Sequence, residues 1–425
     1  MRLAFKLFSC FLVVAALGFS QTAPPTAGLE LSDAVKAGDL AKVMAIVEKD
    51  PRIVNIPNPN GETIIFGALV ERRAEIVEYL ISKGADVNVQ NNFHMAPLHI
   101  ACVRGLPLEL VKLLVEKGAD VNAVSKYQGK PLDLADESGD EAVVRYLTPK
   151  GARYTPLDFE TIKLSSNLHR IAFPWGMRNN LIVFGGSDGL LVIDTGFNKR
   201  ALEAFKKTVS GFAKGDIQYV VNTHSDWDHT AGNAGLAPSE AAVIDAGRLD
   251  NEDLKSILAK SDKPMTGRSG RILPAPYMMK FNGETIDLIP YPGLHSQVDM
   301  MIFFPKPGVV CMGDLLLSQS CPAVRDAGGY LEFLDKVLDV FPAGTMFISG
   351  HGRDLTALGV KKYRDDITAM FEIVKKEYTA GKTVEDMIGA DVLKAYKADY
   401  SHLDWLGPDS WIRRIVRSLA TGRTK

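Results

Sequence analysis

A six-residue motif that returns after 34 positions constrains the fold of the N-terminal part of this chain more than any other feature. KGADVN occupies residues 83–88 and again 117–122, with a weaker KGAR at 150–153 and a degenerate IVN at 53–55. A second motif keeps nearly the same step, as TIIFGA at 63–68, APLHIA at 96–101 and KPLDLA at 130–135. Apolar residues at helical spacing fill the intervals, which predicts helix pairs joined by turns.

These motifs resemble the ankyrin repeat, with its T-P-L-H-x-A helix start and its G-A-D-V-N turn. The resemblance covers about residues 30–153 as about four units, the outer two degenerate. Because one helix pair cannot bury its own apolar face, such units stack into an α-solenoid. We expect His99, at the repeat's own histidine position, to make a turn-stabilising hydrogen bond. The resemblance implies either a protein-binding module or one that docks on the rest of the chain.

The first twenty residues have the pattern of a secretory signal peptide. Arg2 and Lys6 precede an apolar run over 7–19, and a small-x-small cleavage site lies before Gln21. The run of about 13 residues is shorter than the ~20 needed to span a bilayer, so we expect cleavage and no transmembrane span in the mature chain. The sequence therefore predicts export, to the periplasm or to the outside of the cell.

Charge and cysteine content exclude further classes of protein. The 425 residues carry a net charge of −2, which gives no general electrostatic footprint for nucleic acid. Four cysteines exclude a disulfide-stapled scaffold, and the three beyond the signal peptide predict free thiols or one pair at most: Cys102, Cys311 and Cys321.

From about residue 155 the pattern changes to strands alternating with helices. Buried-strand runs are predicted at 180–184, 190–193, 217–221, 242–244, 285–289, 300–304, 309–312 and 346–349, with helices at 199–213 and 330–340. Three further helices are predicted after residue 360, the second over 383–396. The last would bury Trp411 and leave a solvated basic face of Arg413, Arg414 and Arg417, while His169 and His402 are expected at the surface.

Potential metal ligands gather directly after these strands. HSDWDH at 224–229 offers four within six residues: His224, Asp226, Asp228 and His229. His295, Asp314 and His351 follow at similar places, each just past a buried strand or a Gly turn. Imidazole and carboxylate are the ligands that Zn²⁺ or Fe²⁺ needs for two adjacent sites.

This region resembles the metallo-β-lactamase superfamily, with its H-x-H-x-D-H motif, a downstream His, a Gly-Asp after a strand and a final Gly-His. The matching segments are LLVIDTG at 190–196, PGLHSQVD at 292–299, VVCMGDLLL at 309–317 and ISGHG at 348–352. The resemblance covers about residues 158–356 and implies an αβ/βα sandwich with a two-metal site along one edge. Residues 357–425 would then form a C-terminal helical extension.

Carried over residue by residue, the resemblance implies His224 and His295 on one metal, Asp228, His229 and His351 on the other, and Asp314 as a bridge. One position departs, because Asp226 replaces the second histidine. As a ligand it adds a negative charge, which should make a bound water less acidic and favour harder ions, so Fe or Mn joins two Zn²⁺ as an expected cofactor. In the alternative, Asp226 binds no metal and the site holds one ion.

The chemistry implied is hydrolysis, since a bound divalent ion lowers the pKa of water to roughly 7 and supplies hydroxide. Ester, thioester, lactam and phosphoester small-molecule substrates all remain open. Asp228 would double as proton acceptor and Asp194 would orient the motif loop, or act as a plain turn residue. Trp227 either lines the substrate mouth or packs under the loop, and Trp175 and Met177 are weaker pocket candidates.

Two other functions remain. The flavodiiron branch of the superfamily also has a carboxylate at the position of Asp226, which makes a di-iron redox enzyme conceivable, although the sequence shows no flavin-binding domain. The other is an ankyrin scaffold that carries an impaired metal site.

Overall fold

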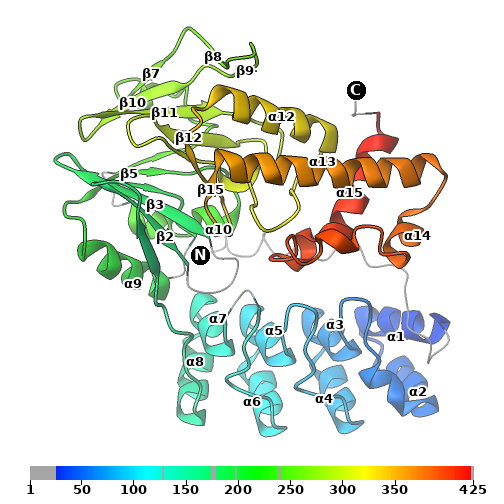
Figure 1. Cartoon of the computed structure of the whole chain (residues 1–425). Helices are drawn as coiled ribbons and strands as arrows, with labels where there is room; N and C mark the ends of the chain where they lie inside the picture. The colour runs from blue at the N-terminus through cyan, green and yellow to red at the C-terminus, as the bar shows by residue number, and fades with distance from the viewer. Residues whose placement is uncertain (1–24, 127–128, 174–178, 197–198, 238–240, 423–425) are drawn as a thin grey trace. The chain divides into compact units, whose positions relative to one another are not determined.

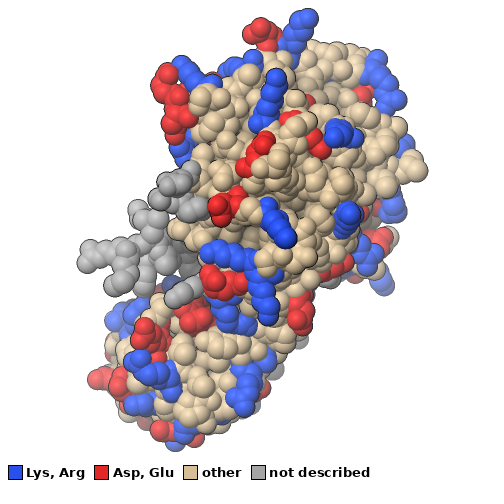
Figure 2. Space-filling model, turned by 90° about the vertical axis from the view of Figure 1, so that its left-hand side faces the viewer, with Lys and Arg blue, Asp and Glu red and all other residues tan. Residues whose placement is uncertain are grey.

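The computed structural model describes residues 25–126, 129–173, 179–196, 199–237 and 241–422. The chain divides into two compact units, residues 1–156 and 157–425. On the face drawn in Figure 2, basic and acidic side chains are interspersed rather than gathered by sign, in keeping with 49 Lys and Arg against 51 Asp and Glu. Within the described residues, no helix combines the length and the apolar character that crossing a bilayer requires.

The first unit is built from short helices that pair in chain order (Figure 1). The first helix of each pair packs on the first helix of the next, so α1 contacts α3, α3 contacts α5 and α5 contacts α7. One apolar core runs through the stack, which confirms the predicted α-solenoid. Its elements are α1 (Pro25–Ala37), α2 (Leu40–Lys49), η2 (Pro51–Asn55), α3 (Ile64–Val70), α4 (Ala74–Ser82), α5 (Pro97–Val103), α6 (Leu108–Glu116), α7 (Pro131–Glu137), α8 (Glu141–Leu147) and η3 (Thr148–Lys150).

Hydrogen bonds between repeats explain why KGADVN recurs. The Asn88 side chain donates to the Gly118 carbonyl at 2.8 Å and accepts from the Asp120 amide at 2.8 Å. Asn55 and Asn122 make the same pair of bonds with the turns that follow them. Gly118 has φ +90, a left-handed conformation that side chains rarely adopt. The glycine therefore makes the turn, and the asparagine ties it to its neighbour.

His99 behaves as its position predicts. Its Nδ1 accepts the Ala96 amide at 3.0 Å, and its Nε2 lies 3.3 Å from the Gly129 carbonyl. The side chain is fully buried, and burial lowers the pKa of the imidazole to about 4. His99 is therefore a neutral structural residue, as expected.

The second unit contains two mixed, open sheets. The first has the order β1-β2-β3-β4-β5-β6 and the second the order β15-β14-β13-β12-β11-β10-β7, beside a two-stranded ribbon of β8 and β9. Neighbouring strands are parallel at β4–β5, β5–β6 and β13–β14 and antiparallel elsewhere.

The first sheet comprises β1 (Glu160–Lys163), β2 (Leu168–Ala172), β3 (Asn180–Gly186), β4 (Gly189–Ile193), β5 (Ile217–Val221) and β6 (Ala242–Ile244). The second comprises β7 (Leu258–Lys260), β10 (Tyr277–Phe281), β11 (Glu284–Pro290), β12 (Met300–Phe304), β13 (Val309–Cys311), β14 (Met346–Ile348) and β15 (Leu355–Thr356). The ribbon is β8 (Met265–Thr266) and β9 (Ile272–Leu273).

Alternating side chains place one apolar core between the sheets and one on each outer face. In β3, Ile182 faces the core between the sheets, while Val183 faces α9 (Lys199–Ser210). In β12, Ile302 faces the same inner core, and Met301 belongs to the core shared with the helices α12, α13 and α15. The result is the predicted αβ/βα sandwich, which is confirmed.

Helices α12 (Ala327–Val340) and α13 (Ala357–Thr379) pack against each other and against α15 (Pro408–Ala420), as Figure 1 shows. The helix predicted over 383–396 is wrong in extent, because α14 (Val384–Gly389) ends before Asp391, which has φ +50. The remaining short elements are α10 (Trp227–Thr230), α11 (Asn233–Leu236), η4 (Glu252–Leu254), η5 (Gly313–Leu315), η6 (Lys394–Tyr396) and η7 (Asp404–Leu406).

One surface prediction is wrong, and two hold only in part. His169 lies buried in β2, with its ring 4.2 Å from that of Phe212. His402 is half-buried, and its backbone amide donates to Gln319. Arg414 is half-buried rather than solvated. The cysteines at 102, 311 and 321 are all buried free thiols.

Candidate metal centre

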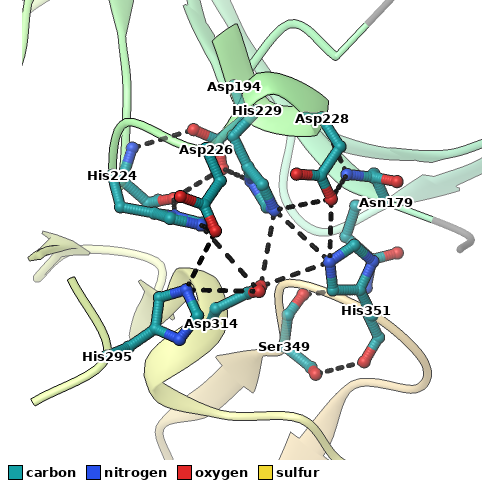
Figure 3. Close-up of polar contacts among 12 residues, drawn as sticks. Asn179, Asp194, His224, Asp226, Asp228, His229, His295, Asp314, Ser349 and His351 are labelled. Atoms are coloured by element: carbon teal, nitrogen blue, oxygen red, sulfur yellow. Dashed lines mark hydrogen bonds and ion pairs between the residues drawn. The ribbon is translucent and has the colours of Figure 1, made fainter. Parts of the chain in front are cut away.

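The predicted ligands converge on one point at an edge of the sandwich (Figure 3). Each follows a strand at its carboxyl end: β5 for the HSDWDH motif, β11 for His295, β13 for Asp314 and β14 for His351. Asp228 and His229 lie on the one-turn helix α10, and Asp314 lies in η5. Strand ends that meet at one edge thus bring together residues more than a hundred positions apart.

Four atoms form what we call group 1: His224 Nε2, Asp226 Oδ2, His295 Nε2 and Asp314 Oδ2. Asp226 Oδ2 lies 3.7 Å from His224 Nε2 and 3.3 Å from His295 Nε2. Asp314 Oδ2 lies 3.9 Å and 3.8 Å from the same two nitrogens. Two imidazoles and two carboxylates therefore face a common centre.

Four other atoms form group 2: Asp228 Oδ2, His229 Nε2, His351 Nε2 and Asp314 Oδ1. His351 Nε2 lies 3.3 Å from Asp228 Oδ2 and 3.3 Å from Asp314 Oδ1. His229 Nε2 lies 3.6 Å, 3.4 Å and 3.4 Å from Asp228 Oδ2, Asp314 Oδ1 and His351 Nε2. Four ligands at 2.0–2.1 Å from a tetrahedral ion are about 3.3–3.4 Å apart, so this spacing fits Zn²⁺.

Asp314 belongs to both groups, one carboxylate oxygen in each. Its Oδ1 and the Nε2 of His224 are buried atoms with no hydrogen-bond partner among the described residues. A buried polar atom without a partner is costly unless something else satisfies it. The donor set and these two orphaned atoms therefore fit a pair of bridged cations.

The imidazoles are oriented by bonds from their other nitrogen. His229 Nδ1 donates to Asp194 Oδ2 at 2.8 Å, and His295 Nδ1 donates to the Ala323 carbonyl at 2.8 Å. The Thr223 hydroxyl donates to Asp194, so at 3.0 Å it accepts from His224 Nδ1. A proton on Nδ1 leaves the Nε2 lone pair free and aimed at the centre, which is how protein metal sites fix the tautomer of a ligating histidine.

The comparisons with known proteins agree with this arrangement. Residues 174–358 match the metallo-beta-lactamase superfamily. Residues 86–158 match the model for ankyrin repeats in three copies, and 60–92 match a single ankyrin repeat. Both resemblances seen in the sequence are thereby confirmed.

Curated relatives match this chain in short segments. The chain is 35% identical over 78 residues to "ANK repeat-containing protein nipk-1" of Caenorhabditis elegans, which is 16% of this chain and 13% of that protein. It is 30% identical over 75 residues to "Protein phosphatase 1 regulatory subunit 27" of Mus musculus, which is 18% of this chain and 49% of that protein. The chain therefore spans half or less of the length of these relatives.

In the region that matches the superfamily, Asp226 is the most exposed member of the cluster. Its side chain is 51% exposed, against 11% or less for the other six. The imidazoles of His224 and His295, at 3.7 Å and 3.3 Å, hold the pKa of the Asp226 carboxyl well below its ordinary value. Asp226, where the superfamily pattern has a histidine, is thus ionised. Its carboxylate faces the other atoms of group 1 and is also open to solvent.

Without metal, two histidines of the cluster bind protons more tightly than an ordinary histidine does. Burial would lower the pKa of His295, but Asp226 and Asp314 raise it to about 9. Burial opposes protonation of His351 too, and Asp314 and Asp228 raise its pKa to about 9. Cations that enter the cluster would displace these protons, because imidazole binds metal in its neutral form.

Asp194 holds the motif loop from beneath. Besides His229 it accepts the Thr223 amide at 2.8 Å and the Thr223 hydroxyl at 2.8 Å. Its backbone has φ +58, a left-handed conformation that is uncommon for a residue other than glycine. These three bonds match the orienting role rather than that of a plain turn residue.

Two asparagines that support the cluster were not predicted from the sequence. The Asn179 side chain donates to the Asp228 carbonyl at 2.8 Å and to Asp228 Oδ2 at 3.1 Å. Asn180 donates to the carbonyls of Ser349 and Gly352, on either side of His351. Paired amides at the start of a buried strand were the available signal, but their partners lie 49 or more positions away.

The remaining pocket candidates divide. Trp227 is half-buried on α10, between the ligands Asp226 and Asp228. Trp175 and Met177 lie outside the described residues. Trp227 is therefore next to two candidate ligands in the chain, and its half-buried side chain fits either of its two predicted roles.

Proposed function

We propose that the second unit is a metal-dependent hydrolase with two bridged ions. The observation that carries the proposal is the placement of Asp314, whose two oxygens each complete a group of four ligand atoms. Family membership alone would leave catalysis open, but an intact set of seven convergent ligands supports a working centre.

Divalent ions bound here would supply a hydroxide near neutral pH and polarise a carbonyl or phosphoryl oxygen. His224, Asp226 and His295 would hold one ion, Asp228, His229 and His351 the other, and Asp314 would bridge. The ions would be two Zn²⁺, or Fe or Mn where the Asp226 carboxylate favours a harder cation. Asp228, fixed by Asn179 and buried within group 2, would take up the proton of the attacking water.

The substrate would be a small molecule with an ester, thioester, lactam or phosphoester bond. The test is metal analysis of the purified chain, followed by a screen with one substrate of each of the four classes. Hydrolysis of one class that is lost in Asp228→Ala, with a folded variant, supports the proposal. No turnover in any class, or turnover that survives Asp228→Ala, argues for the impaired-site alternative.

A redox function is the second candidate, because Asp226 places a carboxylate 3.3 Å from His295 Nε2 within group 1. Such a ligand suits iron better than an all-histidine set does. Two irons in the purified chain together with oxygen consumption would favour this candidate over hydrolysis.

For the first unit we propose protein binding, which ankyrin repeats suggest, with docking on the rest of the chain as the alternative. Cross-linking of the full chain would separate them: cross-links between residues 30–153 and a co-purified protein support binding, and cross-links within the chain alone support docking.

We also propose that the chain is exported and that residues 1–20, which lie outside the described residues, are removed. N-terminal sequencing of the protein recovered outside the cytoplasm should begin at Gln21. Retention of Met1 in a cytoplasmic fraction would contradict export.

A further inference from the structure

One ligand of group 1 is held by a segment that has no regular structure of its own. Residues 318–327, here the 318–327 segment, follow η5 and run to Ala327, the first residue of α12. The Ala323 carbonyl accepts the Nδ1 proton of His295 at 2.8 Å, and the Arg325 amide donates to the Leu294 carbonyl at 3.4 Å. The orientation of His295 therefore depends on where this segment lies.

The C-terminal extension satisfies the backbone of the same segment from the other side. The His402 amide donates to the Gln319 carbonyl at 3.0 Å, and the Cys321 amide donates to the Leu406 carbonyl at 2.7 Å. The Leu403 amide donates to the Ser320 hydroxyl at 3.0 Å. A buried segment without its own ladder needs such external partners for its polar groups.

Helix α15 makes the contacts closest to Ala323. Arg414 Nη1 donates to the Val324 carbonyl at 3.4 Å, one residue beyond Ala323. The fully buried Ser418 hydroxyl accepts the Ala327 amide at 3.2 Å and donates to Asp326 Oδ1 at 3.3 Å. Asp326 caps α12, so Ser418 fixes both the end of the segment and the start of that helix.

We propose that the C-terminal residues 401–418 position the group 1 ligand His295 by holding the 318–327 segment, with Arg414 and Ser418 as positioning residues. The proposal rests on the proposed metal centre but not on hydrolysis. Group 2 lacks this dependence at His229, whose Nδ1 is held by Asp194 instead. Loosening α15 should therefore affect His295 more than His229.

The experiment uses the full chain loaded with Co²⁺ as the probe. The Nδ1 protons of histidines on Co²⁺ give shifted, exchangeable proton NMR signals, and His295→Asn and His229→Asn assign them. The variants are Arg414→Leu and Ser418→Ala, which remove different contacts. If one of them fails to fold, the other still tests the proposal. Arg413→Leu is the matched control, because Arg413 is exposed on the same helix and pairs with Glu385.

We expect faster solvent exchange of the His295 signal in both variants, an unchanged His229 signal, and about tenfold weaker Co²⁺ binding at group 1. Arg414→Lys keeps a donor, so its His295 exchange rate and its Co²⁺ affinity at group 1 should return to the wild-type values. In the metal-free chain, deuterium exchange of the 318–327 segment should also be faster in Arg414→Leu and Ser418→Ala than in the wild type.

Unchanged His295 exchange in both variants, or equal loss at His295 and His229, would overturn the proposal. Failure of the wild-type chain to bind Co²⁺ would overturn it together with the metal centre. A wild-type chain that binds Co²⁺ but hydrolyses nothing contradicts only the proposed function.

Discussion

His229 donates its Nδ1 proton to Asp194 across 2.8 Å, while its Nε2 faces Asp314 Oδ1 at 3.4 Å. The imidazole thus lies between a carboxylate that fixes its tautomer and one that would share its metal. Asp194 also holds Thr223, the residue before His224, so one side chain controls a ligand in each group.

Asp194→Asn should weaken metal binding about 10- to 100-fold, because the amide no longer accepts as strongly from His229 and Thr223. Competition with a chelator measures this in the full chain. Asp216→Asn is the control, since Asp216 is an exposed aspartate just before β5. Equal affinity of Asp194→Asn and wild type would show that Asp194 is a turn residue only.

Asp226→His should make the bound water more acidic, because it removes one negative charge from group 1. The acid limb of the activity profile should move down on the order of one pH unit, and Zn²⁺ should be favoured over Mn. The pH dependence of turnover with each metal tests this. An unmoved acid limb would mean that Asp226 does not face the ion.

The ankyrin unit should lose stability as the pH falls. Burial lowers the pKa of His99 to about 4, so between about pH 6.5 and 4 the unfolded chain binds the proton and the folded chain does not. The loss is present below this window, absent above it, and amounts to at most about 3 kcal/mol.

Deuterium exchange of α5 in the full chain at pH 7 and pH 5 measures this loss. His99→Gln should flatten the pH dependence, and His94→Asn, at an exposed turn, should not. A wild-type chain with equal protection at both values would contradict the expectation.

Gly350→Ala should disrupt the centre. A Cβ there would lie 2.2 Å from Asp314 Oδ1 and 2.7 Å from the Gly313 carbonyl carbon, so the Asp314 carboxylate must move. We expect loss of about 1–3 kcal/mol of stability and of most bound metal. Thermal unfolding and metal analysis test this, with Gly344→Ala as control because a Cβ there meets nothing within 4 Å. Normal metal content in Gly350→Ala would contradict the fit of this site.

The sequence was sufficient for the two folds and for the convergent ligands, because repeat period, strand runs and strand-end positions are local patterns. It was insufficient for β2, which was not among the predicted strands and whose His169 was expected at the surface. His169 is buried against the ring of Phe212, and the neighbouring Arg170 is buried too, because it pairs with Asp354 at 3.2 Å and bonds Asn180 at 2.7 Å. These partners are distant in sequence, and only the folded topology supplies them.

The contacts that orient the candidate ligands could not be predicted either, because their partners are also distant in sequence. A backbone carbonyl such as that of Ala323 has no sequence signature, and its bond to His295 spans 28 positions. Asn179, just before β3, likewise reads as an ordinary polar residue until the fold places it against Asp228.

Metal content of the purified chain and three variants tests the central claim most directly. The account predicts about two ions per chain in the wild type, about one in His295→Ala and in His351→Ala, and fewer than one in Asp314→Ala, since its carboxylate serves both groups. One ion per chain in the wild type, unchanged in His295→Ala, would contradict it.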